Sequence, residues 1–213
     1  MKKDWPAWIV FIGLALALLG TVLIFRVMRH GPAPALPPAG SMLSATMTND
    51  TRPLPEFSFA QVGRRYTNAD LQGHWTLLFF GYTFCPDVCP TSLAAAQDMK
   101  KRLLAAGQVA PDVAFVSVDP ARDTPEVVAR FAHAFDPAFH GAVGDDPSLA
   151  PVGKHLGMHY ERHDAQDKEH YTVDHTAAIY LIDPQGRLKA VFSWPLDPAA
   201  MAKDYPTITG SGV

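Results

Sequence analysis

The sequence predicts an α/β fold, a mixed central sheet flanked by helices, with a single transmembrane helix at its N-terminus. Three observations lead to this prediction. Apolar strand patterns alternate with helical patterns between about residues 57 and 156. A hairpin pattern follows near residues 177–192, and a long uncharged run comes first in the chain. Strand–helix–strand alternation predicts parallel strands, whereas a hairpin adds antiparallel ones.

The uncharged run extends from Trp5 to Phe25. At about 1.5 Å per residue such a helix is roughly 31 Å long, close to the thickness of a bilayer core. We therefore expect a membrane anchor over residues 1–29, with the transmembrane helix at about 5–27. A cleaved signal peptide is the alternative, because Ala33 and Ala35 are small residues near a cleavage position. The run is longer than a usual signal core, however, which favours the anchor.

The rest of the chain divides by composition. Residues 30–51 are rich in Pro and Ala and predict a semi-extended tether. Residues 52–205 carry the strand and helix patterns of one domain, and residues 206–213 form a short tail. The chain has a net charge of −3. Because most basic residues of the N-terminal segment flank the anchor, the remainder is more acidic still, which argues against nucleic-acid binding.

Each element of the predicted domain has a local signal. We expect strands at 57–62, 75–82, 113–118, 141–143, 177–183 and 188–192, and helices at 67–71, 91–106, 124–135 and 148–156. Thr67 and Thr124 are N-cap candidates, and Pro125 suits a first helical turn. Gly107 is typical of the residue that follows a helix.

The only two cysteines, Cys85 and Cys89, lie between a buried strand pattern and a helical pattern. A thiol pair at a strand-to-helix turn is typical of thioredoxin-like folds, but the spacing here is C-x-x-x-C. Helical residues four apart have Cβ atoms about 5–6 Å from each other, whereas a disulfide needs about 3.8 Å. Two thiolates at this spacing can bind one metal ion, and Cys85 can form a disulfide only if it lies off the helical path.

The helix that follows also matters for the thiols, since a helix N-terminus stabilises thiolates. A purely structural disulfide is the alternative, although closing so short a loop stabilises a fold little. Two thiolates and one imidazole form a set that suits Cu(I), while zinc normally takes a fourth ligand. Among nine histidines, His175 stands directly before a predicted strand, where a loop can reach the cysteine turn. Asp174 can support its ring. Spacing alone leaves the choice of histidine open.

Three motifs in order resemble the Sco/SenC family of membrane-anchored copper chaperones. They are GYTFCPDVCP at 81–90, SVDPARDTPE at 117–126, and VDHT at 173–176 followed by YLIDPQG at 180–186. The resemblance covers about residues 54–194. The opening hairpin at 61–65 and the pair His74-Trp75 depart from the family pattern, and the acidic, histidine-bearing loop at 159–174 lies where relatives vary. Residues 119–123 are expected to shape a loop and cap a helix.

The resemblance implies a thioredoxin-like fold and a copper site made by Cys85, Cys89 and His175, carrying Cu(I), Cu(II) or both. It also implies an anchor with its amino end in the cytoplasm and the domain outside. The first residues, MKKDW, do not suit a mitochondrial transit peptide, so we expect a bacterial inner-membrane protein with its C-terminal domain in the periplasm. The partners it implies are subunit II of cytochrome c oxidase, at the CuA centre, and a periplasmic copper donor. On this reading the protein is a metallochaperone and not an enzyme.

Three rival functions remain open from the sequence. A thiol-disulfide oxidoreductase would reduce the cysteines of the oxidase copper site through Cys85 and Cys89 without needing His175. A peroxidase would need one cysteine of low pKa beside a positioned Arg or Thr. A copper or redox sensor would act through a partner and would change gene expression before oxidase activity.

Overall fold

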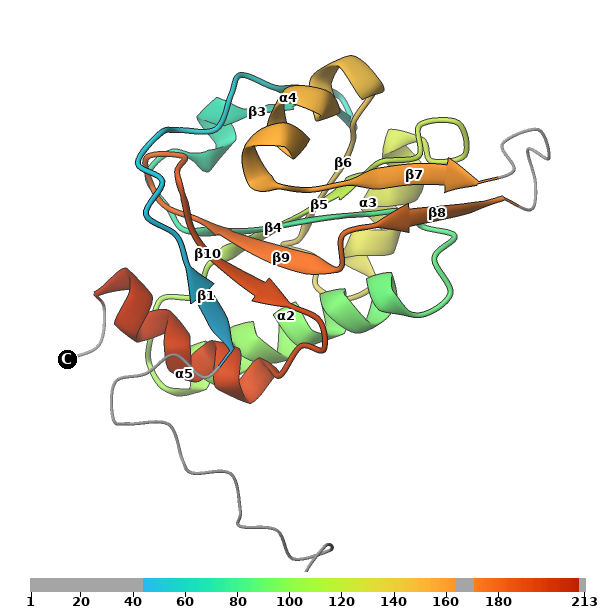
Figure 1. Ribbon diagram of the computed structural model, residues 1–213. Coiled ribbons are helices and arrows are strands. Elements are labelled where there is room, and N and C mark those ends of the chain that lie inside the picture. Colours follow the sequence, from blue (N-terminus) through green and yellow to red (C-terminus); the bar gives the residue numbers. More distant parts are fainter. Residues whose placement is uncertain (1–43, 164–170, 211–213) are drawn as a thin grey trace, which may run out of the picture. The chain divides into compact units, whose positions relative to one another are not determined.

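The computed structural model describes residues 44–163 and 171–210, which form a mixed sheet covered by helices (Figure 1). The predicted transmembrane helix at about 5–27 lies outside these residues. Within the described part of the chain, every helix is too short or too polar to cross a bilayer.

The large sheet has the strand order β1-β10-β9-β4-β5-β6-β2-β3. β4 pairs in parallel with β5, and β5 with β6, while the other neighbours are antiparallel. A separate two-stranded sheet pairs β7 with β8. The strands are β1 (Ala45–Met47), β2 (Ser58–Gln61), β3 (Arg64–Thr67), β4 (Thr76–Gly81), β5 (Asp112–Ser117), β6 (His140–Val143), β7 (Tyr160–His163), β8 (Thr172–His175), β9 (Ala178–Ile182) and β10 (Leu188–Ser193).

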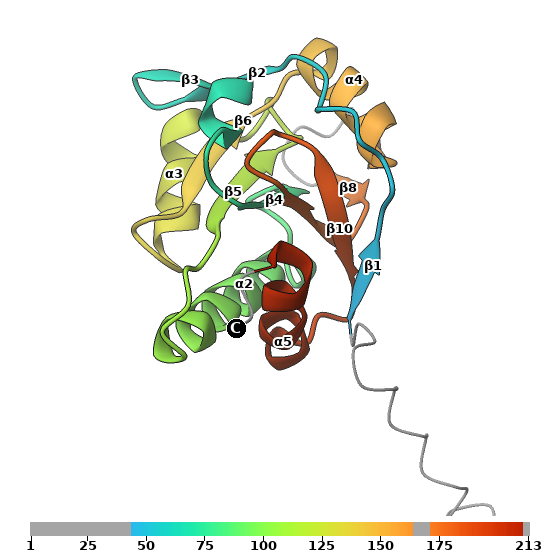
Figure 2. The same ribbon diagram turned by 90° about the vertical axis from the view of Figure 1, so that its left-hand side faces the viewer.

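The helices cover the sheet. They are the 3₁₀ helix η1 (Asn68–Leu71) and the α-helices α2 (Val88–Ala105), α3 (Pro125–His133), α4 (Asp146–Leu156) and α5 (Pro198–Thr209). α2 and α5 lie side by side in both views, on the side of the sheet away from α4 (Figures 1 and 2). α3 packs on β6 so closely that a Cβ on Gly141 would lie 2.7 Å from the carbonyl oxygen of Val128.

The position of the cysteines follows from the central strands. All six residues of β4 are buried, as expected for a strand covered on both faces. The crossover from β4 through α2 to β5 makes the two strands parallel, so the cysteine turn lies at the carboxyl end of β4. β9 runs antiparallel to β4, with Phe79 opposite Ile179. The start of β9 therefore lies at the same edge of the sheet as the cysteine turn.

The strands and helices predicted from local signals are confirmed, with shifts of a few residues at their ends. The largest shift is at α2, which starts at Val88 because Asp87 is its N-cap. Thr124 caps α3 as predicted, accepting a hydrogen bond from the Val127 N–H. The patterns missed β1, β3, β7, β8 and α5. The four strands are short and mostly polar or exposed, so they lack the alternation that marks a half-buried strand.

Candidate metal centre

The cysteine turn is held by the start of α2. Cys85 precedes the N-cap Asp87 and lies off the helix, as its disulfide chemistry would require, while Cys89 is in the first turn. The Cys85 N–H donates to the carbonyl of Tyr82 at 3.3 Å. The Cys89 N–H points at Cys85 Sγ, 3.4 Å away. A backbone donor at a helix N-terminus thus faces one sulfur and stabilises its thiolate form.

Asp123 fixes this turn to the next strand. Its buried carboxylate accepts hydrogen bonds from the Thr83 N–H at 2.9 Å, from the Thr83 hydroxyl, and from Ser117 Oγ at 2.5 Å. The expectation that residues 119–123 shape a loop is confirmed, but the helix cap expected from them is supplied by the next residue, Thr124. Because Thr83 is two residues from Cys85, this carboxylate limits how far the cysteine turn can move.

His175 is the last residue of β8 and faces Cys89. Its Nε2 lies 3.3 Å from Cys89 Sγ, and its Nδ1 lies 3.3 Å from the carbonyl oxygen of Thr176. A carbonyl accepts only from a protonated nitrogen, so this contact favours the proton on Nδ1 and leaves Nε2 free as a ligand. The ring packs edge-on against Phe79 and Tyr82, with centroids 6.0 and 5.9 Å away.

The expected support of His175 by Asp174 is wrong. Successive side chains of a strand point to opposite faces, and Asp174 instead accepts from His163 Nε2 across the hairpin at 2.8 Å. The Asp174 side chain is 76% exposed. The hydrogen-bond partner of the His175 ring is the Thr176 carbonyl and not the Asp174 carboxylate.

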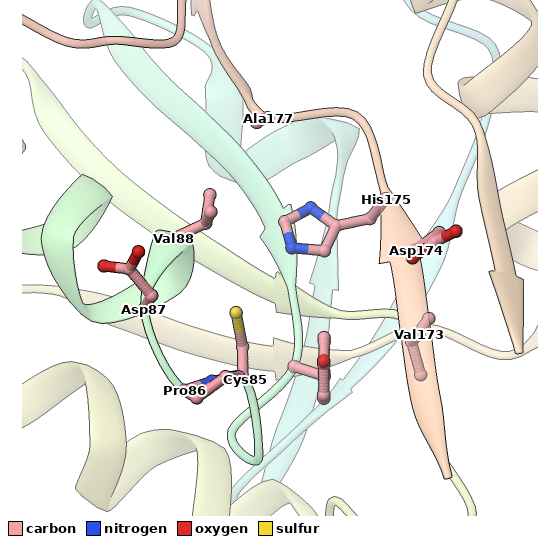
Figure 3. A pocket seen from close by; sticks show the side chains of 9 residues that line it. Cys85, Pro86, Asp87, Val88, Val173, Asp174, His175 and Ala177 are labelled. Atoms are coloured by element: carbon pink, nitrogen blue, oxygen red, sulfur yellow. The ribbon is translucent and has the colours of Figure 1, made fainter. Parts of the chain in front are cut away.

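The three predicted residues lie together at the carboxyl end of β4, where Cys85 and His175 line a surface pocket and Cys89 is fully buried. Cys85 Sγ, Cys89 Sγ and a ring nitrogen of His175 all lie within 4.8 Å of one another. Bonds of about 2.0–2.3 Å to a trigonal ion would place such atoms roughly 4 Å apart, so little movement is needed to close on a metal. The Cys85 side chain and the His175 ring line the pocket together with Val88 and Val173 (Figure 3).

The size of the pocket limits what it can hold. Its volume is about 220 Å³, below the roughly 300–1,000 Å³ of ordinary small-molecule sites. Among the described residues, no other group of three or more His, Cys, Asp or Glu side chains has its ligand atoms this close together. The pocket suits an ion better than an organic substrate.

The two sulfurs differ in their affinity for protons. A hydrogen bond from Cys89 lowers the pKa of Cys85 to about 3, against the opposing effect of burial. The same hydrogen bond and the burial of Cys89 raise the pKa of the Cys89 thiol. The metal-free pair therefore shares one proton, with Cys85 as the thiolate. No disulfide joins the two cysteines in this structure.

One contact of the site region was not predicted from the sequence. Arg122 and Tyr171 meet beside the pocket, where the guanidinium carbon of Arg122 lies 3.5 Å from the centre of the Tyr171 ring. Arg122 is part of a motif noted in the sequence, but Tyr171 comes from a segment without any local signal. Only the folded hairpin brings it to this place.

The fold and the site together define a class of protein. A mixed sheet with a thiol pair at the end of a central strand, capped by a helix, is thioredoxin-like, and the adjacent imidazole adds a metal-binding arrangement. A family model described as SCO1/SenC matches residues 45–209. The chain belongs to this family.

Individual relatives agree with this assignment. The chain is 30% identical to Protein sco1 of Schizosaccharomyces pombe over 198 residues, which cover 89% of this chain and 73% of the relative. It is 36% identical to the mitochondrial SCO2 homolog of Bos taurus over 132 residues, covering 62% of this chain. That match spans only 50% of the cattle protein's length.

Solved structures share the fold. ScoI of Bradyrhizobium japonicum, solved with copper bound, is 37% identical with a TM-score of 0.62, covering 72% of this chain and 97% of that one. Apo Sco1 of Thermus thermophilus is 31% identical with a TM-score of 0.66, covering 82% and 97% of the two chains.

Proposed function

We propose that this protein is a copper chaperone that carries copper on the sulfurs of Cys85 and Cys89 and on Nε2 of His175. The observation that carries the proposal is that these three ligand atoms lie within 4.8 Å of one another. Two thiolates and one imidazole are soft ligands that suit Cu(I). The similarity to ScoI of Bradyrhizobium japonicum, which has copper bound, supports the same cargo here.

Delivery would proceed by exchange of ligands. The pocket is at the surface, and Cys85 is partly exposed whereas Cys89 is fully buried. A thiolate of an acceptor can therefore replace Cys85 first, while Cys89 and His175 still hold the ion. The ion would leave last from the buried sulfur. All three ligands must be deprotonated to bind, so acidification would weaken the complex.

The acceptor that we propose is the CuA centre of cytochrome c oxidase, on subunit II, with a periplasmic protein as copper donor. Membership of the SCO1/SenC family supports this role. We further propose that residues 1–29 anchor the protein in the bacterial inner membrane. The tether at 30–51 would then present residues 52–205 on the periplasmic side, followed by the tail at 206–213.

Copper stoichiometry of the full-length chain tests the proposal. Reduced protein would be loaded with Cu(I) without oxygen, as wild type, as His175→Ala, and as the control His159→Ala, whose side chain is 80% exposed. We expect one copper per chain in the wild type and the control. The affinity of His175→Ala should fall by at least about 10-fold. Equal weak binding in all three proteins would disprove the metal role.

The alternative function is that of a thiol-disulfide oxidoreductase, which the close approach of two free cysteines favours. In that reaction the Cys85 thiolate attacks a disulfide of the oxidase copper site. Cys89 then gives up its proton and resolves the mixed disulfide. This protein would end with a Cys85–Cys89 disulfide, and the acceptor with two thiols. Because no metal is involved, His175→Ala would retain this activity, which separates the two functions.

A further inference from the structure

The strand that carries His175 is not part of the large sheet. β8 pairs only with β7 among the described strands, with Tyr160 opposite His175. The ladder of the large sheet brings the chain to this edge at Ala178, the first residue of β9, but it does not include His175 itself. Side-chain contacts between the β7–β8 hairpin and the body of the domain therefore help to hold the imidazole in place.

Arg122 makes several of these contacts. It belongs to the loop between β5 and α3, and its side chain is only 9% exposed. Its Nε donates to the fully buried carboxylate of Asp119 at 2.7 Å. The same carboxylate accepts from the hydroxyl of Tyr171, next to β8. The ion pair with Arg122 offsets the free-energy cost of burying the Asp119 charge, and it fixes the plane of the guanidinium.

On one side the guanidinium contacts the hairpin. Its Nη1 donates to the backbone carbonyl of Tyr171 at 2.8 Å, and its carbon lies 3.5 Å from the centre of the Tyr171 ring. On the other side it lies 4.8 Å from the ring of Phe84, the neighbour of Cys85. The ring of Tyr82, which packs on His175, is 5.7 Å away.

Only arginine can make this set of contacts. A guanidinium is planar, so it can stack on an aromatic ring while its edges donate to a carboxylate and a carbonyl. A lysine ammonium keeps the charge but has neither the plane nor the fork of donors. The contacts join two segments that are about 50 residues apart in the chain but adjacent at the site.

We infer that Arg122 is a positioning residue, which clamps the hairpin that carries His175 against the turn that carries Cys85 and so sets the distance between imidazole and thiolates. The inference rests on the proposed function only for the identity of the ion. The placement of His175 can be measured without metal, so the proposed function and the positioning role of Arg122 can fail separately.

The first measurement uses the reduced, metal-free, full-length chain labelled with ¹⁵N. Arg122→Lys is compared with Arg187→Lys, in which another arginine paired with a buried carboxylate, that of Asp183, is changed in the same way. We expect Arg122→Lys to shift the ring resonances of His175 and the amide signals of residues 172–176. Arg187→Lys should leave these signals in place.

The second measurement is a double-mutant cycle on Cu(I) affinity, determined by competition with a chromophoric chelator. Arg122→Lys should weaken binding by about 10-fold when His175 is present. In the His175→Ala background the same change should alter affinity by less than about 2-fold, because the residue on which Arg122 acts is then missing. Tyr171→Leu, which removes the stacking ring and leaves Arg122 paired, should repeat both effects.

Two results would overturn the inference. In the first, Arg122→Lys and Arg187→Lys lower the unfolding midpoint alike and leave the His175 signals unchanged, so Arg122 only stabilises the fold. In the second, Arg122→Lys lowers the Cu(I) affinity as much in the His175→Ala background as in the wild-type background.

If wild type binds no copper but Arg122→Lys still moves His175, the proposed function fails and the positioning role stands. Tyr171→Leu decides the matter if Arg122→Lys does not fold.

Discussion

At the scale of single residues, the site requires a glycine at position 81 as well as its three ligand residues. Gly81 ends β4 directly behind the buried thiol. A Cβ there would lie 2.5 Å from Cys89 Sγ and 3.0 Å from Cε2 of Phe115. Both distances are shorter than normal contacts, and Phe115 is fully buried in the core and cannot easily move. The glycine therefore leaves the space that the sulfur occupies.

Gly81→Ala tests this at the residue scale. Displacement of Cys89 Sγ should weaken Cu(I) binding by at least about 10-fold. Overpacking should lower the free energy of unfolding by about 1 to 3 kcal/mol. The matched control is Gly141→Ala, where the added Cβ meets the backbone of α3 far from the cysteines. The control should be destabilised but bind copper normally, and normal binding by Gly81→Ala would refute the argument.

At the scale of elements, the edge of the sheet depends on a strand and a helix that the sequence patterns did not show. β1 adds to the free edge of β10. The buried carboxylate of Asp204 in α5 accepts from the N–H groups of Ser44 at 2.7 Å and Ala45 at 3.0 Å. The start of the described chain is thus tied to its last helix.

Shortening the chain tests this tie. A chain that begins at Asn49 lacks β1 and the donors to Asp204, whereas one that begins at Gly40 keeps them. Hydrogen bonds to charged groups contribute about 1.5 to 3 kcal/mol, so we expect the shorter chain to lose at least that much free energy of unfolding. Urea unfolding of the two chains measures the difference. Equal midpoints and slopes would show that β1 adds nothing.

The turn between β9 and β10 is a second element with a defined electrostatic role. Asp183 is almost fully buried and accepts from the N–H groups of Gln185 at 3.0 Å and Arg187 at 2.9 Å. Burial opposes ionisation, but these bonds and the Arg187 guanidinium prevail and hold the pKa of Asp183 below its ordinary value of 3.8. A lowered folded pKa stabilises the protein above pH 3.8, and this stabilisation is lost as pH falls through the folded value.

Asp183→Asn should therefore cost about 1.5 to 3 kcal/mol of unfolding free energy at pH 7. The difference from wild type should shrink as pH falls below 3.8, because the wild-type carboxyl then takes up a proton. Urea unfolding of both proteins at a series of pH values measures this difference in unfolding free energy. Asp98→Asn, at an exposed ion pair, is the control and should change little at any pH. A difference independent of pH would mean that charge is not the cause.

At the scale of the whole molecule, the site joins segments that are distant in the chain. Cys89 comes from the start of α2, and His175 lies 86 residues later at the end of β8. Copper bound between them would link both to the folded state. Binding to the native chain alone raises stability by mass action, by about 4.1 kcal/mol when free ligand is 1,000 times the dissociation constant.

Unfolding with and without chelator-buffered Cu(I) should show this gain in the full-length wild type. His175→Ala should gain less, because one of the three ligands is missing. The double variant Cys85→Ser/Cys89→Ser should gain nothing, since it has lost both sulfurs. Stabilisation of the double variant equal to that of wild type would place copper elsewhere on the chain.

The sequence by itself determined most of the elements and the two cysteines of the site. Strands such as β4 are uniformly apolar, and helix starts such as Thr124 carry their own capping signals, so local patterns suffice to find them. The position of the C-x-x-x-C motif, at the start of a helical pattern, placed both thiols at a helix N-terminus. These features depend on residues that are neighbours in the chain, which is why they can be predicted without a fold.

Only the tertiary structure decided which groups surround the thiols. Spacing left His175 as one of several histidines, and only the antiparallel pairing of β9 with β4 brings it to Cys89. The same holds for Thr176 in place of Asp174 as the partner of the His175 ring, and for the stacking of Arg122 on Tyr171. The physical reason is that these contacts depend on strand register and on the faces to which side chains point, which no local pattern records.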